Sequence, residues 1–277
     1  MKFGLLATGY KGLKVLEKLN HTPVFVASYD NKEKYMFEKI KQLCQVKKIP
    51  FYHRDDFKHD IDIEKIFTVG WQFLVKENLE KYIVLHDSYL PERRGFCPTV
   101  SALCDGCEHL GASAFRPIEG NGPDYGVVVG REKVNIVHPM KIDVAFDIVS
   151  DLYVSLIDKL LTEKENAVEV DYKQSTFSIW QDKNDFRINW SDTAENIHRK
   201  ICASGYPYDG ATTMYDGKLI HIKKSTVCEP LNILNQQSNC GKFWTVKNGV
   251  ATVICGSGLL DVVSDDIEFT LLRKRFL

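Results

Sequence analysis

The residues best suited to chemistry lie in one short run of the sequence, H-D-S-Y-L-P-E-R-R-G at positions 86–95. The run begins with His86, and an imidazole can act as a general acid or base near neutral pH. Pro91 and Gly95 favour a loop rather than a helix, so polar side chains gather on a turn that follows an apolar segment. This context indicates either a catalytic site or, as the alternative, a core histidine with satisfied hydrogen bonds.

Two other patterns are incomplete as functional motifs. Gly9 and Gly12 follow the first apolar run as T-G-Y-K-G, without the first glycine of the dinucleotide-binding fingerprint, so we expect a tight turn rather than a nicotinamide site. Cys104 and Cys107 form one C-x-x-C, but a structural zinc site normally needs a second pair of ligands at similar spacing. We therefore expect no bound metal.

The elements that must position these residues are those of an α/β fold. Over the first 150 residues or so, short β-rich runs alternate with longer helical ones, which is typical of a doubly wound, mostly parallel sheet. His86 then lies at the carboxyl end of a central strand, where open α/β sheets bind their ligands. The expected strands are 2–7, 24–28, 49–52, 65–69, 82–86, 111–116 and 125–130, and the expected helices begin near 12, 32 and 143.

The chain changes character after the helix expected at 143–161. Residues 162–185 are polar and charged with few helix or strand signals, and we predict a linker there. Two domains follow from this prediction: a catalytic domain over 1–185, including the linker, and a small β-rich domain over 186–277.

The second domain is expected to be a small β-sheet or barrel. One helix is expected over 192–203, with Ser191 as its N-cap. Asp216-Gly217 and Asn248-Gly249 lie between apolar runs and predict hairpin turns. The expected strands are 211–215, 219–224, 243–246, 250–255, 259–263 and 268–272.

Composition limits the class of protein and its compartment. A net charge of -1 and an almost balanced charge over 186–277, with 11 Lys/Arg against 9 Asp/Glu, argue against a nucleic-acid partner. The eight cysteines show no disulfide framework, which is consistent with a reducing compartment. No signal peptide and no apolar run of about 20 residues are recognisable, so we expect a cytoplasmic protein without a membrane partner.

The run at 86–95 resembles the H-x-S-L-L-P-x-x-x-G signature of folate-dependent formyltransferases. It matches at His86, Ser88, Leu90, Pro91 and Gly95, and has a tyrosine at 89 where the family has leucine. Residues 69–74, V-G-W-Q-F-L, resemble the family's glycine-aromatic segment, and 124–126, D-Y-G, resemble its D-x-G motif. The resemblance continues more faintly through 188–190 and 206–211. It implies a Rossmann-like formyltransferase domain followed by a small barrel-like domain.

The resemblance implies transfer of a formyl group from N10-formyltetrahydrofolate to a neutral amine. The attack forms a tetrahedral intermediate with an oxyanion, and the amine must lose a proton. By the motif match, His86 takes part in both tasks, because imidazole can accept a proton and can donate to developing negative charge. Asp124 is expected to orient His86 and balance its charge.

One position departs from the family pattern. The family has an asparagine two residues before the histidine, which donates a hydrogen bond to the oxyanion, and here that position is Val84. Loss of such a donor typically costs about 10²–10³ in rate. Asn121 is a candidate replacement donor; a slower enzyme that relies on His86 and a backbone N–H, or a folate-binding protein without turnover, are the alternatives.

The resemblance also suggests which residues bind the donor and the acceptor. Expected donor-binding residues are Gly70, Trp71, Phe73, Leu74, Leu90 and Gly122. Expected acceptor-binding residues are Ser88, Arg93, Arg94 and Tyr208. For the tryptophan, the arginines and the tyrosine, a structural or solvated role is the alternative.

The expected acceptor is an amino sugar linked to a nucleotide, because relatives with this chemistry act on such sugars. Many of these relatives are dimers, and we expect a homodimer here. The main alternative is methionyl-tRNA formyltransferase, a family that usually carries a basic C-terminal domain. Salt-sensitive binding to tRNA would favour that alternative.

Overall fold

The computed structural model describes residues 1–30, 34–57, 62–73 and 78–277. The chain folds as two compact units. The first contains residues 1–98, 109–135 and 145–179, and the second contains 99–108, 136–144 and 180–277. The boundary predicted at 185 therefore lies a few residues beyond the point where the second unit's main segment begins, and two short segments from the first half of the sequence also belong to that unit.

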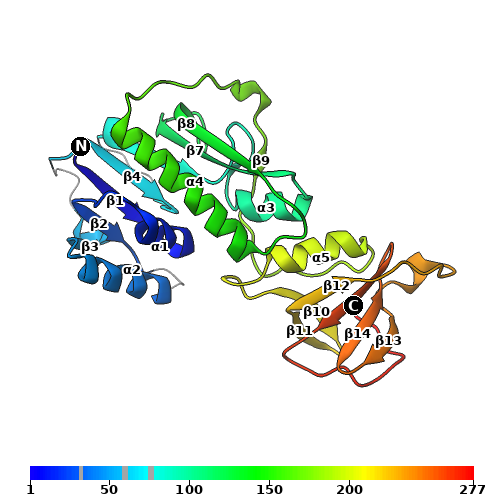
Figure 1. Ribbon diagram of the computed structural model, residues 1–277. Helices are drawn as coiled ribbons and strands as arrows, with labels where there is room; N and C mark the ends of the chain where they lie inside the picture. Colours follow the sequence, from blue (N-terminus) through cyan, green and yellow to red (C-terminus); the bar gives the residue numbers. More distant parts are fainter. Residues whose placement is uncertain (31–33, 58–61, 74–77) are drawn as a thin grey trace. The chain divides into compact units, whose positions relative to one another are not determined.

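A seven-stranded sheet forms the centre of the first unit (Figure 1), and its order is β3-β2-β1-β4-β5-β7-β8. The first five strands of this order are parallel, and β7 and β8 are antiparallel to their neighbours. The predicted α/β class with a mostly parallel sheet is confirmed. The strands are β1 (Phe3–Ala7), β2 (Phe25–Ser28), β3 (Phe51–His53), β4 (Lys65–Val69), β5 (Tyr82–His86), β7 (His109–Pro117) and β8 (Gly126–Asn135).

Three helices cover one face of this sheet: α1 (Gly9–Lys18), α2 (Lys34–Lys47) and α4 (Ile142–Thr162) (Figure 1). Hydrogen bonds join α1 to both neighbours, since Lys18 binds Asp151 on α4 and Lys47 of α2 binds the carbonyl of Leu16. Side chains alternate between the two faces of a strand. His86 and Val84, on β5, therefore lie on the face opposite the helices.

That opposite face carries two apolar clusters. One contains Phe57 and Ile63 packed against β1, β2, β4 and β5. The other contains Leu90, Phe115 and Val128, with Val84 and the later residues Val168, Val170 and Tyr172 packed against it. The segment 163–179, named here the connecting segment, therefore covers the sheet beside His86. It contains a short 3-10 turn (Tyr172–Gln174) and β9 (Phe177–Ser178), so the polar stretch predicted as a linker is packed for much of its length.

Near its start the connecting segment contributes Glu165 to a group of ion pairs. Because of this group, we expect the stability of the fold to depend on pH. The Glu165 carboxylate accepts a hydrogen bond from Arg116 at 2.7 Å and lies 3.2 Å from Lys65. The hydrogen bond from Arg116 lowers the pKa of Glu165 below its ordinary value of 4.5. A carboxyl with a lowered folded-state pKa stabilises the fold above its unfolded pKa, and that contribution is lost as pH falls through the folded value.

We expect Glu165→Gln to make the free energy of unfolding less dependent on pH in acid. Wild type should lose more unfolding free energy than the variant between about pH 6 and about pH 3.5, measured by urea unfolding at each pH. The exposed Glu17, paired with Lys14 at 3.6 Å, offers the matched control Glu17→Gln. Parallel curves for wild type and Glu165→Gln would contradict the assignment.

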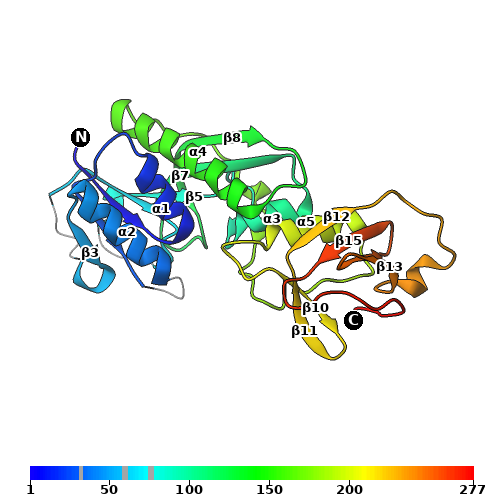
Figure 2. The same ribbon diagram turned by 60° about the horizontal axis from the view of Figure 1, so that its bottom comes forward.

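The second unit combines a helix with antiparallel β-sheets. Strands β10 (Ala211–Tyr215) and β11 (Lys218–Ile222) form a hairpin, and a four-stranded sheet has the order β12-β15-β14-β13. Its strands are β12 (Lys224–Val227), β13 (Phe243–Lys247), β14 (Val250–Ile254) and β15 (Leu259–Val263). Helix α5 (Ala194–Ala203) lies beside β12 (Figure 2), and its Ile197 and Ile201 belong to the apolar core of this unit.

Local predictions in the second unit are mostly confirmed, with two corrections. Asp216-Gly217 and Asn248-Gly249 make the expected hairpin turns, and all four residues have positive φ, as the two-residue hairpin turn requires. The N-cap of α5 is Thr193, not Ser191, because the Thr193 hydroxyl accepts from the Asn196 N–H. The strand expected at 268–272 is wrong: only an isolated bridge from Phe269 to Gly249 forms there.

A further helix, α3 (Pro98–Asp105), follows the 86–95 run and carries Cys104. Among the helices of the described residues, none has both the length and the apolar character needed to cross a bilayer.

Candidate active site

His86 and Asp124 come together at the carboxyl end of β5. His86 is only 6% exposed, and its Nδ1 lies 3.6 Å from Oδ2 of Asp124. The same Asp124 oxygen accepts a hydrogen bond of 2.7 Å from the Gly95 N–H. Asp124 itself has φ +48°, a left-handed conformation that aspartate adopts more readily than most residues. The two residues, 38 positions apart in the sequence, therefore form a pair.

Both ring nitrogens of His86 face oxygen atoms. With Asp124 ionised, both of these oxygens are hydrogen-bond acceptors and neither is a donor. Nε2 lies 3.0 Å from the Arg93 carbonyl, and Nδ1 faces the Asp124 carboxylate. Each of these oxygens can accept a hydrogen bond from a ring nitrogen that carries a proton. The ring is therefore held between a backbone carbonyl and a carboxylate.

Gly95 is restricted to glycine by its surroundings. Its φ is +102°, and a Cβ atom there would lie 2.5 Å from the Ser178 carbonyl. The bare backbone lets the Gly95 N–H reach Asp124 while the neighbouring Phe96 N–H bonds to Ser178 at 3.0 Å. The last position of the H-D-S-Y-L-P-E-R-R-G run therefore serves the geometry of Asp124.

A second charged group lies directly beside the pair. Asp87 forms an ion pair of 2.7 Å with Lys11 of α1, and the Tyr153 hydroxyl donates to Asp87 at 3.4 Å. Burial, and then the charge of Asp87, raise the pKa of Tyr153 well above its ordinary range. Tyr153 therefore remains a neutral donor, and Lys11 compensates the charge of Asp87.

Aromatic side chains gather at the ends of the neighbouring parallel strands. Tyr29, Trp71 and Phe73 contact one another edge to face, with ring centroids 4.6–5.8 Å apart. The Arg54 guanidinium lies 4.2 Å from the Phe73 ring. Gly70 precedes this cluster with φ +66°, and its carbonyl accepts a hydrogen bond of 2.5 Å from the Thr8 hydroxyl. This end of the sheet therefore offers an aromatic cluster with a cation beside it.

Comparison with known proteins decides the family. The chain is 32% identical to a methionyl-tRNA formyltransferase of Clostridium novyi over 219 residues, which cover 76% of this chain and 68% of that protein. The chain belongs to the formyltransferase family. Residues 181–268 also match the family model described as the C-terminal domain of formyl transferases. The resemblance found in the sequence is thereby confirmed, and the chain is an enzyme of the class that transfers formyl groups.

Solved structures agree with this fold. A sugar 3-N-formyltransferase, solved in the presence of dTDP and 5-N-formyl-THF, matches with a TM-score of 0.70 at 13% identity and covers 96% of this chain and 98% of its own. An N-formyltransferase from Helicobacter canadensis, in complex with folinic acid and dTDP-3-aminofucose, matches with a TM-score of 0.65 at 16% identity and covers 95% and 99%.

Three residues expected to contact ligands are buried in the structure, and their ligand-binding roles stay predictions. Leu90 is fully buried against Phe115, so the predicted contact with the donor is not open to it in this structure. Ser88 is buried and its hydroxyl donates to the Glu92 carbonyl at 2.5 Å, which closes the loop. Arg94 is 5% exposed and its donors bond to protein oxygens, which favours a structural task over acceptor binding.

The other predicted site residues are more accessible, and their functions stay predictions. Asn121 and Gly122 are exposed in the loop before Asp124. Arg93 is partly exposed in the 86–95 loop and has φ +50°. Tyr208 belongs to the second unit, where its ring lies 5.5 Å from that of Phe186. Leu74 lies outside the described residues.

Val84, which replaces the family's asparagine, packs in the apolar cluster with Leu90 and Phe115. A donor at that position would be surrounded by hydrocarbon from Val168 and Val170. The valine therefore agrees with its apolar surroundings.

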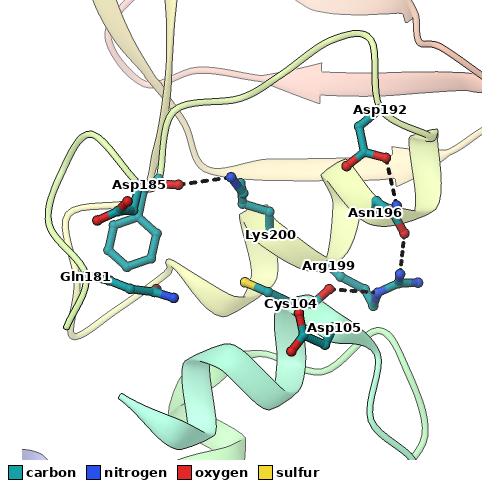
Figure 3. A pocket seen from close by; sticks show the side chains of 9 residues that line it. Cys104, Asp105, Gln181, Asp185, Asp192, Asn196, Arg199 and Lys200 are labelled. Carbon is teal, nitrogen blue, oxygen red and sulfur yellow. Dashed lines mark hydrogen bonds between the residues drawn. The ribbon is translucent and has the colours of Figure 1, made fainter. Parts of the chain in front are cut away.

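The second unit contains a polar pocket of about 480 Å³ (Figure 3). Its two cations are engaged: Arg199 donates to the Cys104 carbonyl and to Asn196, and Lys200 donates to the Asp185 carbonyl at 2.9 Å. Three aspartates outnumber these cations, so the pocket does not favour an anion. The lining residues are Cys104, Asp105, Gln181, Asp185, Phe186, Asp192, Asn196, Arg199 and Lys200.

Sequence reasoning did not find the Lys11–Asp87–Tyr153 group. Asp87 lies in the 86–95 run, and Lys11 lies in T-G-Y-K-G, where α1 begins, but their pairing depends on which strand ends are neighbours. Within the described residues, no group of three or more His, Cys, Asp or Glu side chains is arranged to hold a metal ion.

Proposed function

We propose that this formyltransferase transfers the formyl group of N10-formyltetrahydrofolate to the amine of a nucleotide-linked amino sugar. The observation that carries the proposal is the His86–Asp124 pair, with 3.6 Å between Nδ1 and Oδ2, at the carboxyl end of β5 in a chain of this family. Open α/β sheets bind their ligands at this edge. The proposal includes the homodimer and the cytoplasmic location expected from the sequence.

The described residues fit a folate donor. The aromatic cluster of Tyr29, Trp71 and Phe73 is suited to packing against a flat ring, and Arg54 is suited to a carboxylate of the glutamate tail. The donor supplies the activated formyl carbon. The amine nitrogen bonds to the formyl carbon, and the bond from that carbon to N10 breaks. His86 accepts the proton of the attacking amine and returns it to N10 of the departing tetrahydrofolate, while Asp124 stabilises the transient imidazolium.

The surroundings of His86 determine which ring nitrogen can accept the proton of the amine. Nδ1 of His86 faces Asp124, so the amine must approach Nε2, which bonds to the Arg93 carbonyl at 3.0 Å. The incoming amine therefore has to replace this carbonyl. Because Arg93 lies in a surface loop, we expect acceptor binding to turn that peptide.

An amino sugar is favoured over tRNA by charge and by fold. Nucleic-acid binding relies on a basic surface, whereas residues 186–277 carry 11 Lys/Arg and 9 Asp/Glu. The matched sugar N-formyltransferases cover 95% or more of this chain with TM-scores of 0.65–0.70.

Methionyl-tRNA is the second candidate acceptor, and a specific observation favours it. The relative from Clostridium novyi, at 32% identity, is a methionyl-tRNA formyltransferase. That acceptor predicts binding to tRNA that weakens steeply with salt, because phosphate contacts release counterions.

The deciding experiment incubates the purified protein with N10-formyltetrahydrofolate and one acceptor at a time, and follows a mass gain of about 28 Da, the difference between –NH₂ and –NH–CHO. The acceptors are nucleotide-linked 3-amino and 4-amino sugars and charged initiator tRNA. A gain on a sugar, absent in His86→Asn, supports the proposal. A gain on the tRNA alone would replace it with the second candidate.

A further inference from the structure

We propose that Arg94 is a positioning residue that holds Asp124 at His86 and ties the connecting segment (163–179) to the same loop. Its kinetic part rests on the proposed function; its structural part does not. The inference assigns Arg94 a task within the protein rather than a contact with the acceptor.

The donors of Arg94 converge on the loop that ends in Asp124. Nε donates to the Pro123 carbonyl at 2.9 Å, and Nη2 donates to the Asn121 carbonyl at 3.0 Å. A guanidinium presents its donors in a fixed plane, so two bonds to carbonyls two residues apart set the orientation of the peptides between them. These are the peptides that lead directly into Asp124.

The next residue completes the arrangement from the other side. The Gly95 N–H binds the Asp124 carboxylate at 2.7 Å. Arg94 and Gly95 therefore hold the backbone before Asp124 and the side chain of Asp124 at the same time. Because both belong to the loop that begins with His86, the acid and the base are positioned by a single short segment.

The connecting segment supplies the third side of the guanidinium site. Nη1 of Arg94 donates to the Ser175 hydroxyl at 3.2 Å, and the Tyr172 and Phe177 rings lie 5.2 and 5.0 Å from the guanidinium carbon. The Tyr172 hydroxyl also donates to the Gly126 carbonyl at 2.9 Å, just beyond Asp124. Burial raises the pKa of Tyr172, so this donor remains protonated.

The support of Arg94 depends on where the connecting segment lies. Displacement of the connecting segment removes Ser175 and the aromatic rings from Arg94, and Arg94 then loses the support that fixes its plane. The position of Asp124 is thus coupled to a segment that continues into the second unit along the chain.

The test compares Arg94→Lys with the matched control Arg116→Lys, which alters an arginine bound to the start of the same connecting segment at Glu165. Lysine keeps the charge but cannot bond in one plane to Asn121, Pro123 and Ser175. We expect Arg94→Lys to lower kcat by up to about 10²-fold with KM for donor and acceptor nearly unchanged, because misplacement of a reacting group acts on the transition state.

An independent readout needs no acceptor. In Arg94→Lys, amide hydrogen exchange over 119–126 and 172–178 should become about 10-fold faster or more, since bonds from a charged donor are lost. Arg116→Lys should leave exchange over 119–126 unchanged. If wild type formylates none of the acceptors, the proposed function fails while this exchange result still decides the positioning role.

Two results would overturn the inference. One is unchanged exchange over 119–126 in Arg94→Lys; the other is a rise in acceptor KM with kcat unchanged, which is the behaviour of a substrate-binding arginine. Should Arg94→Lys not fold, Ser175→Ala removes one partner only, and the same faster exchange over 119–126, smaller in extent, is required.

Discussion

His86→Asn is expected to lower kcat for formyl transfer by about 10²–10⁴-fold, the range that a positioned general acid or base contributes. Asparagine resembles the near half of histidine in size and polarity, but it cannot accept the amine proton. Initial rates from the mass assay at saturating donor and acceptor measure the loss.

The matched control for this change is His21→Asn. His21 lies on the surface with its Nε2 3.9 Å from Asp158, and its replacement should leave kcat unchanged. The thermal midpoint of His86→Asn should be compared with wild type to separate chemistry from unfolding. An active His86→Asn enzyme of normal stability would remove His86 from the mechanism.

Asp124→Asn is expected to cost nearly as much, up to about 10⁴-fold, as when an amide replaces the aspartate that orients a catalytic histidine. The amide oxygen can still accept from the Gly95 N–H, so the loop is kept. However, the amide cannot stabilise the imidazolium, and its NH₂ group favours the wrong tautomer of His86. The measurement is kcat together with its pH dependence.

The double variant makes this prediction sharper. Residues that act as one unit show strongly non-additive effects, so His86→Asn with Asp124→Asn should be little slower than His86→Asn alone. A product of the two single effects would show that Asp124 acts independently of His86. The control is Asp30→Asn, which changes a surface carboxylate near His53.

Much of the fold follows from local patterns that need no tertiary information. The strands at 65–69, 82–86, 211–215 and 259–263 were expected with the bounds that the structure has, because runs of apolar and β-branched residues are bounded by turn residues. The Asp216-Gly217 and Asn248-Gly249 turns are equally local, since their positive φ values suit these residue pairs.

The predictions for the candidate site also divide into those that local sequence supports and those that need the tertiary structure. The sequence alone identified the family and named His86 and Asp124 as the candidate catalytic residues, because each lies in a short local motif, 86–95 and 124–126. It did not determine what Leu90, Ser88 and Arg94 do. Each belongs to the same motif, yet the structure buries all three.

Only the tertiary structure shows their burial and their hydrogen-bond partners, because both depend on segments distant in the chain. Arg94 was expected to meet the acceptor, and its carbonyl partners lie 27 and 29 residues away, with Ser175 81 residues away. Lys11 and Asp87 form an ion pair because β1 and β5 both border β4. A motif specifies which side chains are present, whereas strand order and the packing of the connecting segment determine which of them face a substrate and which hold the others in place.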